Sequence, residues 1–187
     1  LWSKEQQSRL PKQSTPEIMH SDMSSFILET AIWGSDVLAL ALLDYPSDAQ
    51  LSQGFALLSQ LELFDDDKQI TAIGRKAHGL GCHPSLAVML LKSAKMSPEH
   101  LSLACALAAL IENKDPMGRT ATGASLSARL HFVLQQKNHL IWQSIRQWHT
   151  KLACRLLAWP IEDTAVLVGY AYPQWLAKKR KDERYQL

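Results

Sequence analysis

The chain has 187 residues, of which 47% are hydrophobic, and its 20 Lys and Arg against 18 Asp and Glu give a net charge of +2. This length and composition predict one or two globular domains with a sizeable core. The longest nearly uncharged stretch, 96–111, is too short and too mixed to cross a membrane, and the polar start of the chain does not resemble a signal peptide.

The three cysteines, Cys82, Cys105 and Cys154, lack the spacing of a disulfide framework or a C-x-x-C motif. They predict reduced thiols in a cytoplasmic protein. Cys105 lies in an apolar run and is predicted to be core. Cys82, beside His83 and near His78, hints at a metal, but no second ligand pair in the sequence supports one.

The charge is unevenly distributed. Residues 1–95 carry 8 basic and 11 acidic side chains, a balance of −3, whereas residues 96–187 carry 12 basic and 7 acidic, a balance of +5. The second half is therefore the more suitable face for a polyanion. A solvated helical surface explains most asymmetries of this kind, so charge alone does not establish binding.

The first part of the chain predicts helices around a small hairpin. Ser21 or Asp22 caps a helix that ends near Gly34, and a short helix over 36–42 follows. A capping box of Ser47 and Gln50 opens the next helix, which is followed by a hairpin over 63–71 with an Asp-rich turn. Helices that start at Thr71 and at His83-Pro84 complete a winged helix.

The second part predicts a helical bundle. Ser97, Pro98 and Glu99 start a helix that ends at 112–113, and its apolar run places it in the middle of the bundle. Further helices are predicted over 125–136, 138–157 and 162–171. The core stripe expected for the second of these consists of Ile141, Ile145, Trp148, Leu152 and Leu156.

Basic side chains of this half are the candidate binding residues. Arg119 lies in the loop 114–123 between two predicted helices, where ligand contacts are common. Arg129, Lys137 and Arg146 follow on the next two helices. An ordinary surface loop whose arginine contacts no ligand is an equally good interpretation.

Motifs of nucleotide chemistry are missing from the sequence. It has no G-x-x-x-x-G-K-[ST] loop and no D-E-x-H motif, and the three carboxylates at 65–67 are typical of a solvated turn. No Ser-His-Asp or Cys-His set can be identified either. We therefore expect the chain by itself to lack catalytic activity and to hold no cofactor.

The amino-acid sequence of several segments resembles the region that follows the motor domains in DEAH-box RNA helicases. The matching segments are Asp44-Tyr45-Pro46, 57–65, 70–75 and 84–90, with Pro16-Glu17-Ile18 before them. The loop 114–123 and the Tyr172-Pro173 segment resemble the HrpB branch of that family. Gln174 and Trp175 depart from the pattern, in which Asp and Arg are usual.

The resemblance implies a mainly α fold, in which a winged-helix subdomain with a small β-hairpin precedes an α-helical ratchet bundle. Its domains would be the tail of a motor domain (1–14), the winged helix (15–95), the ratchet (96–172) and the start of an OB-like domain (173–187). ATP and Mg²⁺ would bind in motor domains that precede Leu1. Single-stranded RNA and those motor domains would be the partners, with Arg119, Arg129, Lys137 and Arg146 lining the RNA channel.

A stand-alone winged-helix regulator that binds DNA is the alternative. It requires a recognition helix with several exposed polar or basic residues. The helix after Thr71 offers only Arg75, Lys76 and His78. A chain that begins at Leu1 is also expected to be part of a longer protein.

Overall fold

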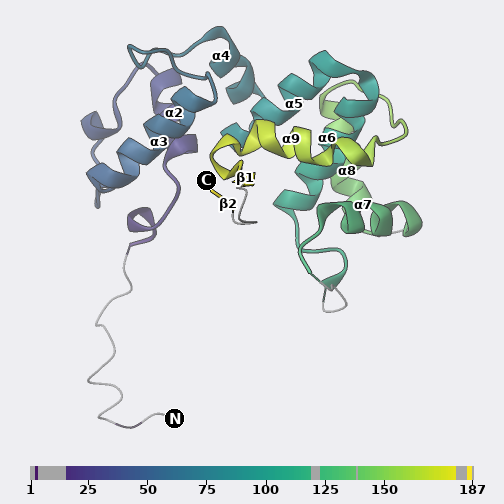
Figure 1. Ribbon diagram of the computed structural model, residues 1–187. Coiled ribbons are helices and arrows are strands. Elements are labelled where there is room, and N and C mark those ends of the chain that lie inside the picture. The colour runs from purple at the N-terminus through teal and green to yellow at the C-terminus, as the bar shows by residue number, and fades with distance from the viewer. Residues whose placement is uncertain (1–2, 4–15, 119–122, 138, 180–184, 187) are drawn as a thin grey trace.

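The computed structural model (Figure 1) describes residue 3 and residues 16–118, 123–137, 139–179 and 185–186, and it is mainly helical, as predicted. The helices are α2 (Ser24–Ile32), α3 (Asp48–Gln60), α4 (Ala72–Gly79), α5 (Pro84–Met96), α6 (Pro98–Glu112), α7 (Leu126–Gln135), α8 (Ile141–Lys151) and α9 (Thr164–Ala171). Short 3₁₀ turns and one small sheet complete the described elements: Glu17–Met19, Val37–Ala39, Ile161–Asp163 and Pro173–Trp175, with β1 (Lys178–Lys179) antiparallel to β2 (Tyr185–Gln186).

Capping residues fix the starts of α3, α4, α5 and α6 where the sequence predicts them. Ser47 and Gln50 form the complete capping box of α3. Thr71 accepts a hydrogen bond from the backbone N–H of Gly74 at the start of α4. Pro84 and Pro98 occupy the first turns of α5 and α6. Each capping side chain satisfies an N–H group that has no partner inside its helix, whereas a proline in the first turn has no N–H to satisfy.

At the start of α2, the carboxylate of Asp22 accepts the backbone N–H of Ser24 at 2.7 Å. The helix ends before Gly34, whose φ of 77° gives the left-handed backbone expected there. The short helix expected over 36–42 is only a 3₁₀ turn over 37–39, capped by Asp36.

One antiparallel bridge joins Phe64 and Ile70 in the segment predicted as a hairpin. Between them, the Asp65 carboxylate accepts the backbone N–H groups of Asp67 at 3.1 Å and Gln69 at 2.7 Å, which closes the turn. Two full strands do not form in this part of the described chain.

Two clusters of buried side chains make up the core of the described residues, and α5 contributes to both. Leu86, Met89 and Leu90 of α5 belong to the cluster with α6, α7, α8 and α9. Ala87 and Val88 belong to the cluster with α2, α3 and α4. The apolar run of α6 is buried from Ser102 to Leu110, so α6 is central to the bundle as predicted. The domain boundaries proposed from the sequence remain predictions.

The helix predicted over 138–157 is wrong in its second half. It ends at Lys151, and Ala153 adopts a φ of 49°. Ala153 N–H bonds the carbonyl of Thr150, and Cys154 N–H bonds that of His149, which is a Schellman ending built without glycine. Leu156, predicted as core, is therefore 56% exposed.

The chain then returns along the bundle. Helix α9 packs beside α5, where the ammonium of Lys92 lies 5.6 Å from the ring centre of Tyr170 (Figure 1). Trp175 stacks on Tyr172 at 4.4 Å in the following turn. None of the helices in the described ranges is long and apolar enough to cross a membrane.

Candidate nucleic-acid interface

The structure describes both ends of the loop 114–123, and Arg119 itself lies outside the described residues. At the near end of the loop, Asp115 accepts the N–H of Met117 at 3.0 Å, and Gly118 has a φ of 53°. At the far end, Gly123 has a φ of 89°. Both glycines adopt the left-handed backbone that other residues avoid, so they fix how the loop leaves and re-enters the bundle.

Arg129 forms hydrogen bonds with residues on both sides of this loop. Its Nε and Nη2 donate to one carboxylate oxygen of Asp115 at 3.0 and 2.5 Å, and its Nη1 donates to the carbonyl of Ser125. The hydrogen bonds that Asp115 accepts from the Arg129 side chain, and then from the N–H of Met117, hold the pKa of Asp115 below its usual value. The arginine side chain is only 15% exposed. Arg129 therefore ties the loop to α7.

Lys137 and Arg146 come together on one hollow at the junction of α7 and α8. The hollow has a volume of about 190 Å³. Its lining consists of Lys137, His139, Leu140, Trp142, Gln143 and Arg146. Of the four predicted binding residues, these two are therefore the ones that the described structure places at a common site.

Trp142 holds the turn that brings the two cations together. Its indole N–H reaches the carbonyls of Val133 and Gln136, each at 3.2 Å, and the ring stacks on Trp159 at 5.6 Å. Because Trp142 is buried at the start of α8, it fixes the end of α7 against that helix. Arg146 lies one turn after Trp142, so its side chain shares the same side of α8.

No carboxylate in the described ranges lies within ion-pair distance of Lys137 or Arg146. Both residues are exposed, and their positive charges are uncompensated in their surroundings. By contrast, the ammonium of Lys151 donates to the carbonyl of Leu80 and lies 5.3 Å from the ring centre of Trp148. Lys151 thus ties α8 to the end of α4 rather than joining the hollow.

Sequence reasoning missed two polar members of the site, His139 and Gln143. The ring of His139 lies edge-on to Phe132 at 6.2 Å, and its Nδ1 accepts the backbone N–H of Ile141 at 3.1 Å. Gln143 is exposed beside Arg146 on α8. The available signal was the i, i+3 spacing of Gln143 and Arg146, which places both on one helical face.

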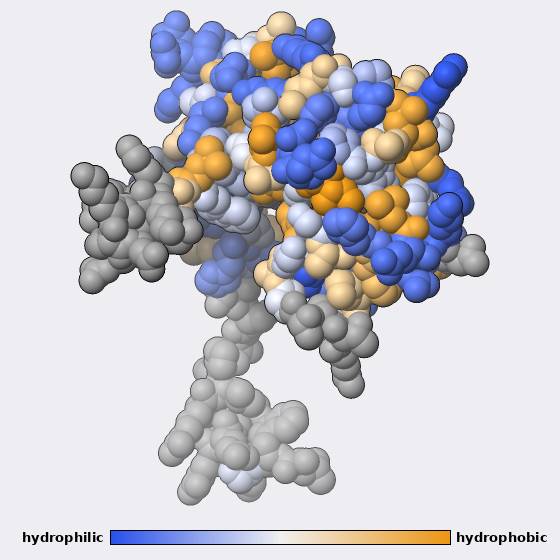
Figure 2. Space-filling model, turned by 45° about the vertical axis from the view of Figure 1, so that its right-hand side comes forward, coloured by the Kyte–Doolittle hydropathy of each residue, from blue (hydrophilic) through white to orange (hydrophobic). Residues whose placement is uncertain are grey.

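Figure 2 shows that polar side chains do not gather into one stripe on the face it presents, where blue and orange groups alternate. Exposed apolar side chains of the described chain include Leu140 at the rim of the hollow, at 74%. The hollow is a local site with two positive charges and an apolar rim.

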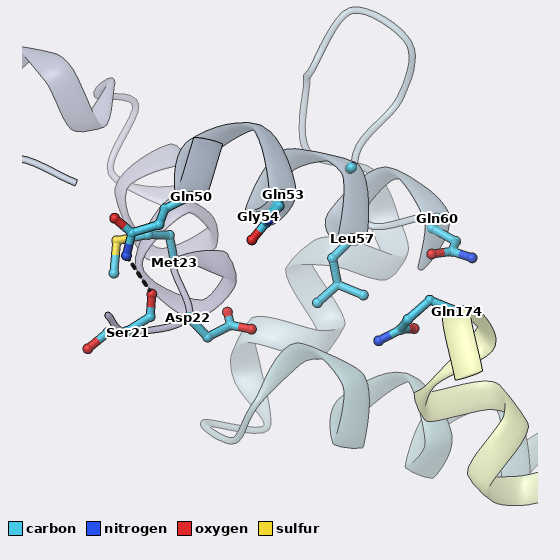
Figure 3. A pocket seen from close by; sticks show the side chains of 10 residues that line it. Ser21, Asp22, Met23, Gln50, Gln53, Gly54, Leu57, Gln60 and Gln174 are labelled. Atoms are coloured by element: carbon cyan, nitrogen blue, oxygen red, sulfur yellow. Dashed lines mark hydrogen bonds between the residues drawn. The ribbon is translucent and has the colours of Figure 1, made fainter. Parts of the chain in front are cut away.

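A second cavity, of about 370 Å³, has different chemistry (Figure 3). Gln50, Gln53 and Gln60 reach it from α3, and Gln174 faces Leu57 from the opposite wall. The amide of Gln50 donates to the carbonyl of Ser21 at 3.1 Å across one end. Among the residues that the structure describes, Asp22 is the only charged one in its lining. A cavity whose described lining has a carboxylate and no cation does not favour a phosphate.

Ser24, His83 and Asp22 lie together but do not form a catalytic triad. Asp22 bonds directly to the Ser24 hydroxyl, and His83 Nε2 is 3.3 Å from that hydroxyl. The other ring nitrogen of His83, Nδ1, accepts the N–H of Ser85, and the Asp22 carboxylate lies 3.8 Å from Nε2, on the same side of the ring as the serine. The serine is fully buried. These groups instead join the start of α2 to the start of α5.

The metal suggested by Cys82 and its neighbouring histidines has no geometric support in the described chain. His78 Nε2 is 2.6 Å from the carboxylate of Glu29, and His83 is used as described above. Burial raises the pKa of the Cys82 thiol to about 12. The three side chains line one cavity, but their ligand atoms do not all lie within 4.8 Å of one another.

Comparison with known proteins gives relatives that cover all or most of the chain, although no family model matches. The chain is 34% identical over 190 residues to the ATP-dependent RNA helicase HrpB of Escherichia coli strain K12, covering 100% of this chain and 22% of that protein. It is 27% identical over 139 residues to the ATP-dependent RNA helicase HrpA of the same strain, covering 70% of this chain and 11% of the relative.

A crystal structure of the Escherichia coli DEAH/RHA helicase HrpB superposes with a TM-score of 0.79 at 30% identity, covering 98% of this chain and 22% of that one. The chain thus spans about a fifth of the length of these HrpB proteins. The relatives are helicases, which leaves the interpretation as a stand-alone DNA-binding regulator without support.

Proposed function

Because this chain is homologous to the HrpB and HrpA ATP-dependent RNA helicases of the DEAH-box type, we propose that it forms their accessory region and contacts RNA. In this proposal, α2 to α5 with the Phe64–Ile70 turn form a winged helix, and α6 to α9 form a ratchet bundle beside the RNA channel. ATP hydrolysis, with its ATP and Mg²⁺, belongs to motor domains that the chain does not contain.

The hollow of Lys137 and Arg146 is the observation that supports the RNA contact. Proteins that hold single strands without reading sequence place positive charge along the phosphates. Two exposed cations that face one hollow, without a carboxylate partner among the described residues, match that requirement. Gln143 adds an amide that can donate to a phosphate oxygen.

Arg119 and Arg129 have different roles in this proposal. Arg129 donates to Asp115 and so positions the loop 114–123. Arg119, which lies in that loop, would contact the RNA backbone. An RNA strand would then pass from the loop to the end of α7, and contacts along this path would be mainly to phosphates.

The test is RNA binding by the chain, followed by fluorescence anisotropy of a labelled single-stranded RNA at several salt concentrations. The variant Lys137→Gln/Arg146→Gln removes both charges from exposed positions. For single strands, each lost phosphate contact lowers the slope of log affinity against log salt by about 0.7, so the double variant should lower it by about 1.4. Binding should weaken equally for RNAs of different sequence.

Arg155→Gln is the matched control, because it removes one exposed charge outside the hollow. Its slope of log affinity against log salt should differ by less than about 0.3 from that of the unsubstituted chain. This is well below the change of about 0.7 expected for one lost phosphate contact. Equal losses in the control and in either single variant at the hollow would contradict the assignment. Unchanged binding in the double variant would also refute it.

A further inference from the structure

Three side chains with soft metal-binding atoms converge inside the bundle, outside the RNA-binding hollow. Cys105 comes from the middle of α6, His149 from the last turn of α8, and Cys154 from the turn after it. One ligand atom from each lies within 4.8 Å of the other two. Within the described part of the chain, this is the group of three that could hold a metal ion.

The Schellman ending of α8 creates this arrangement. Ala153, with its φ of 49°, turns the chain so that the N–H of Cys154 bonds the carbonyl of His149 at 3.0 Å. Had α8 continued, residues five positions apart would have pointed about 140° away from each other. The turn instead places the Cys154 sulfur 3.4 Å from Nδ1 of His149.

The observed spacings match those of a tetrahedral zinc site. Zinc binds thiolate sulfur at about 2.3 Å and imidazole nitrogen at about 2.0–2.1 Å, so ligand atoms around it are separated by about 3.8 Å (S to S) and about 3.5 Å (S to N). The sulfurs of Cys105 and Cys154 are 3.8 Å apart, and the Cys154–His149 distance is 3.4 Å. A disulfide would require sulfurs at about 2.05 Å.

The histidine of the group has one ring nitrogen beside a sulfur and one without a partner. His149 is 8% exposed, and its Nε2 has no hydrogen-bond partner among the described residues. Buried polar groups are normally paired, because an unpaired one loses its hydration without compensation. Nδ1 lies 3.4 Å from the Cys154 sulfur and is therefore the nitrogen placed to bind a metal, while Nε2 would carry the ring proton.

We propose that Cys105, His149 and Cys154 bind a zinc ion that joins α6 to the end of α8. Two thiolates and a neutral imidazole make a complex of zero net charge with Zn²⁺, which suits a site inside an apolar cluster. A monovalent copper ion would leave a charge of −1 in the same place. Cys105 is fully buried, whereas Cys154 is partly exposed, so the ion can reach the site from solvent on the Cys154 side.

Cobalt binding tests this proposal, because Co²⁺ can replace Zn²⁺ and absorbs visible light when thiolates bind it. The chain, without an affinity tag, is first freed of metal with a chelator, and its cysteines are reduced. One equivalent of Co²⁺ should give a thiolate charge-transfer band and the visible bands of tetrahedral cobalt, and Zn²⁺ should abolish both. The melting temperature should rise by about 5–10 °C at a zinc concentration near 100 times Kd. Failure of the unmodified chain to bind one cobalt in this way would overturn the proposal.

Cys154→Ser removes one ligand at a partly exposed position and should lose the charge-transfer band and the zinc-dependent melting shift. Cys82→Ser is the matched control, since Cys82 packs against the same core cluster but lies outside the group of three. It should retain both signals. Loss of the signals in Cys82→Ser, or their persistence in Cys154→Ser, would refute the assigned ligands.

Discussion

Substitution of Gly74 by alanine should destabilise the protein, although alanine normally favours a helix. Gly74 lies in the first turn of α4, and a Cβ added there would come within 2.4 Å of the carbonyl oxygen of Leu63 and 3.1 Å of an Ile70 methyl. Ordinary contacts of this kind are 3.4–4 Å, so backbone would have to move by about 1 Å. The obstacle is not the end of a flexible side chain.

The carbonyl that must move also holds the turn together. It accepts the N–H of Thr71 at 3.0 Å and the Thr71 hydroxyl at 3.2 Å. Overpacking costs about 1–3 kcal/mol, and a weakened hydrogen bond costs about 1 kcal/mol. The better helix propensity of alanine offsets at most about 1 kcal/mol. The expected net loss in free energy of unfolding is therefore about 2 kcal/mol.

Urea unfolding followed by circular dichroism measures this loss, and Gly79→Ala provides the control. Gly79 ends the same helix, has ordinary backbone, and nothing lies within 4 Å of its added Cβ. Gly79→Ala should be neutral or stabilising by up to about 1 kcal/mol. The reasoning is refuted if Gly74→Ala is as stable as Gly79→Ala with an unchanged dependence on urea.

Three further outcomes are expected. Asp22→Asn should destabilise the chain at neutral pH: burial raises the carboxyl pKa, but hydrogen bonds from Ser24 lower it more, so the folded value lies below 3.8. The stability that the ionised Asp22 carboxylate adds is present above pH 3.8 and is lost as pH falls through the folded pKa. The unfolding curves of variant and parent should therefore converge in acid. Asp115→Asn should increase proteolysis in the loop 114–123 without changing helix content, because it weakens the bond to Arg129. Purified chain should show no ATP turnover above a buffer blank, since its sequence has no phosphate-binding loop.

Helix starts were predictable because their signals are local. Ser47, Thr71 and Ser97 each cap a helix with a side chain that bonds a backbone N–H three residues later. The end of α8 was not predictable in the same way. Ala153 carries the left-handed backbone there, and alanine gives no sign of it because glycine usually has this role.

The candidate site was only partly predictable for the same reason. Positive charge in the second half of the chain could be counted, but the partner of each cation depends on tertiary contacts. Asp115 and Arg129 are fourteen residues apart and pair across a loop, whereas Lys137 and Arg146 meet because Trp142 anchors the turn between their helices. No sequence spacing distinguishes a paired arginine from an unpaired one.

Helix α5 connects the proposed RNA contact to the rest of the chain. Leu86, Met89 and Leu90 are buried in one cluster, and Ala87 and Val88 are buried in the other. Separating the clusters would expose one of these faces, and each large aliphatic side chain contributes about 1.5–3 kcal/mol when fully buried. The hydrogen bond from Lys151 to Leu80 joins α8 to the end of α4 as well. A displacement of the region before α5 should therefore carry α8, and with it Arg146, along as one body.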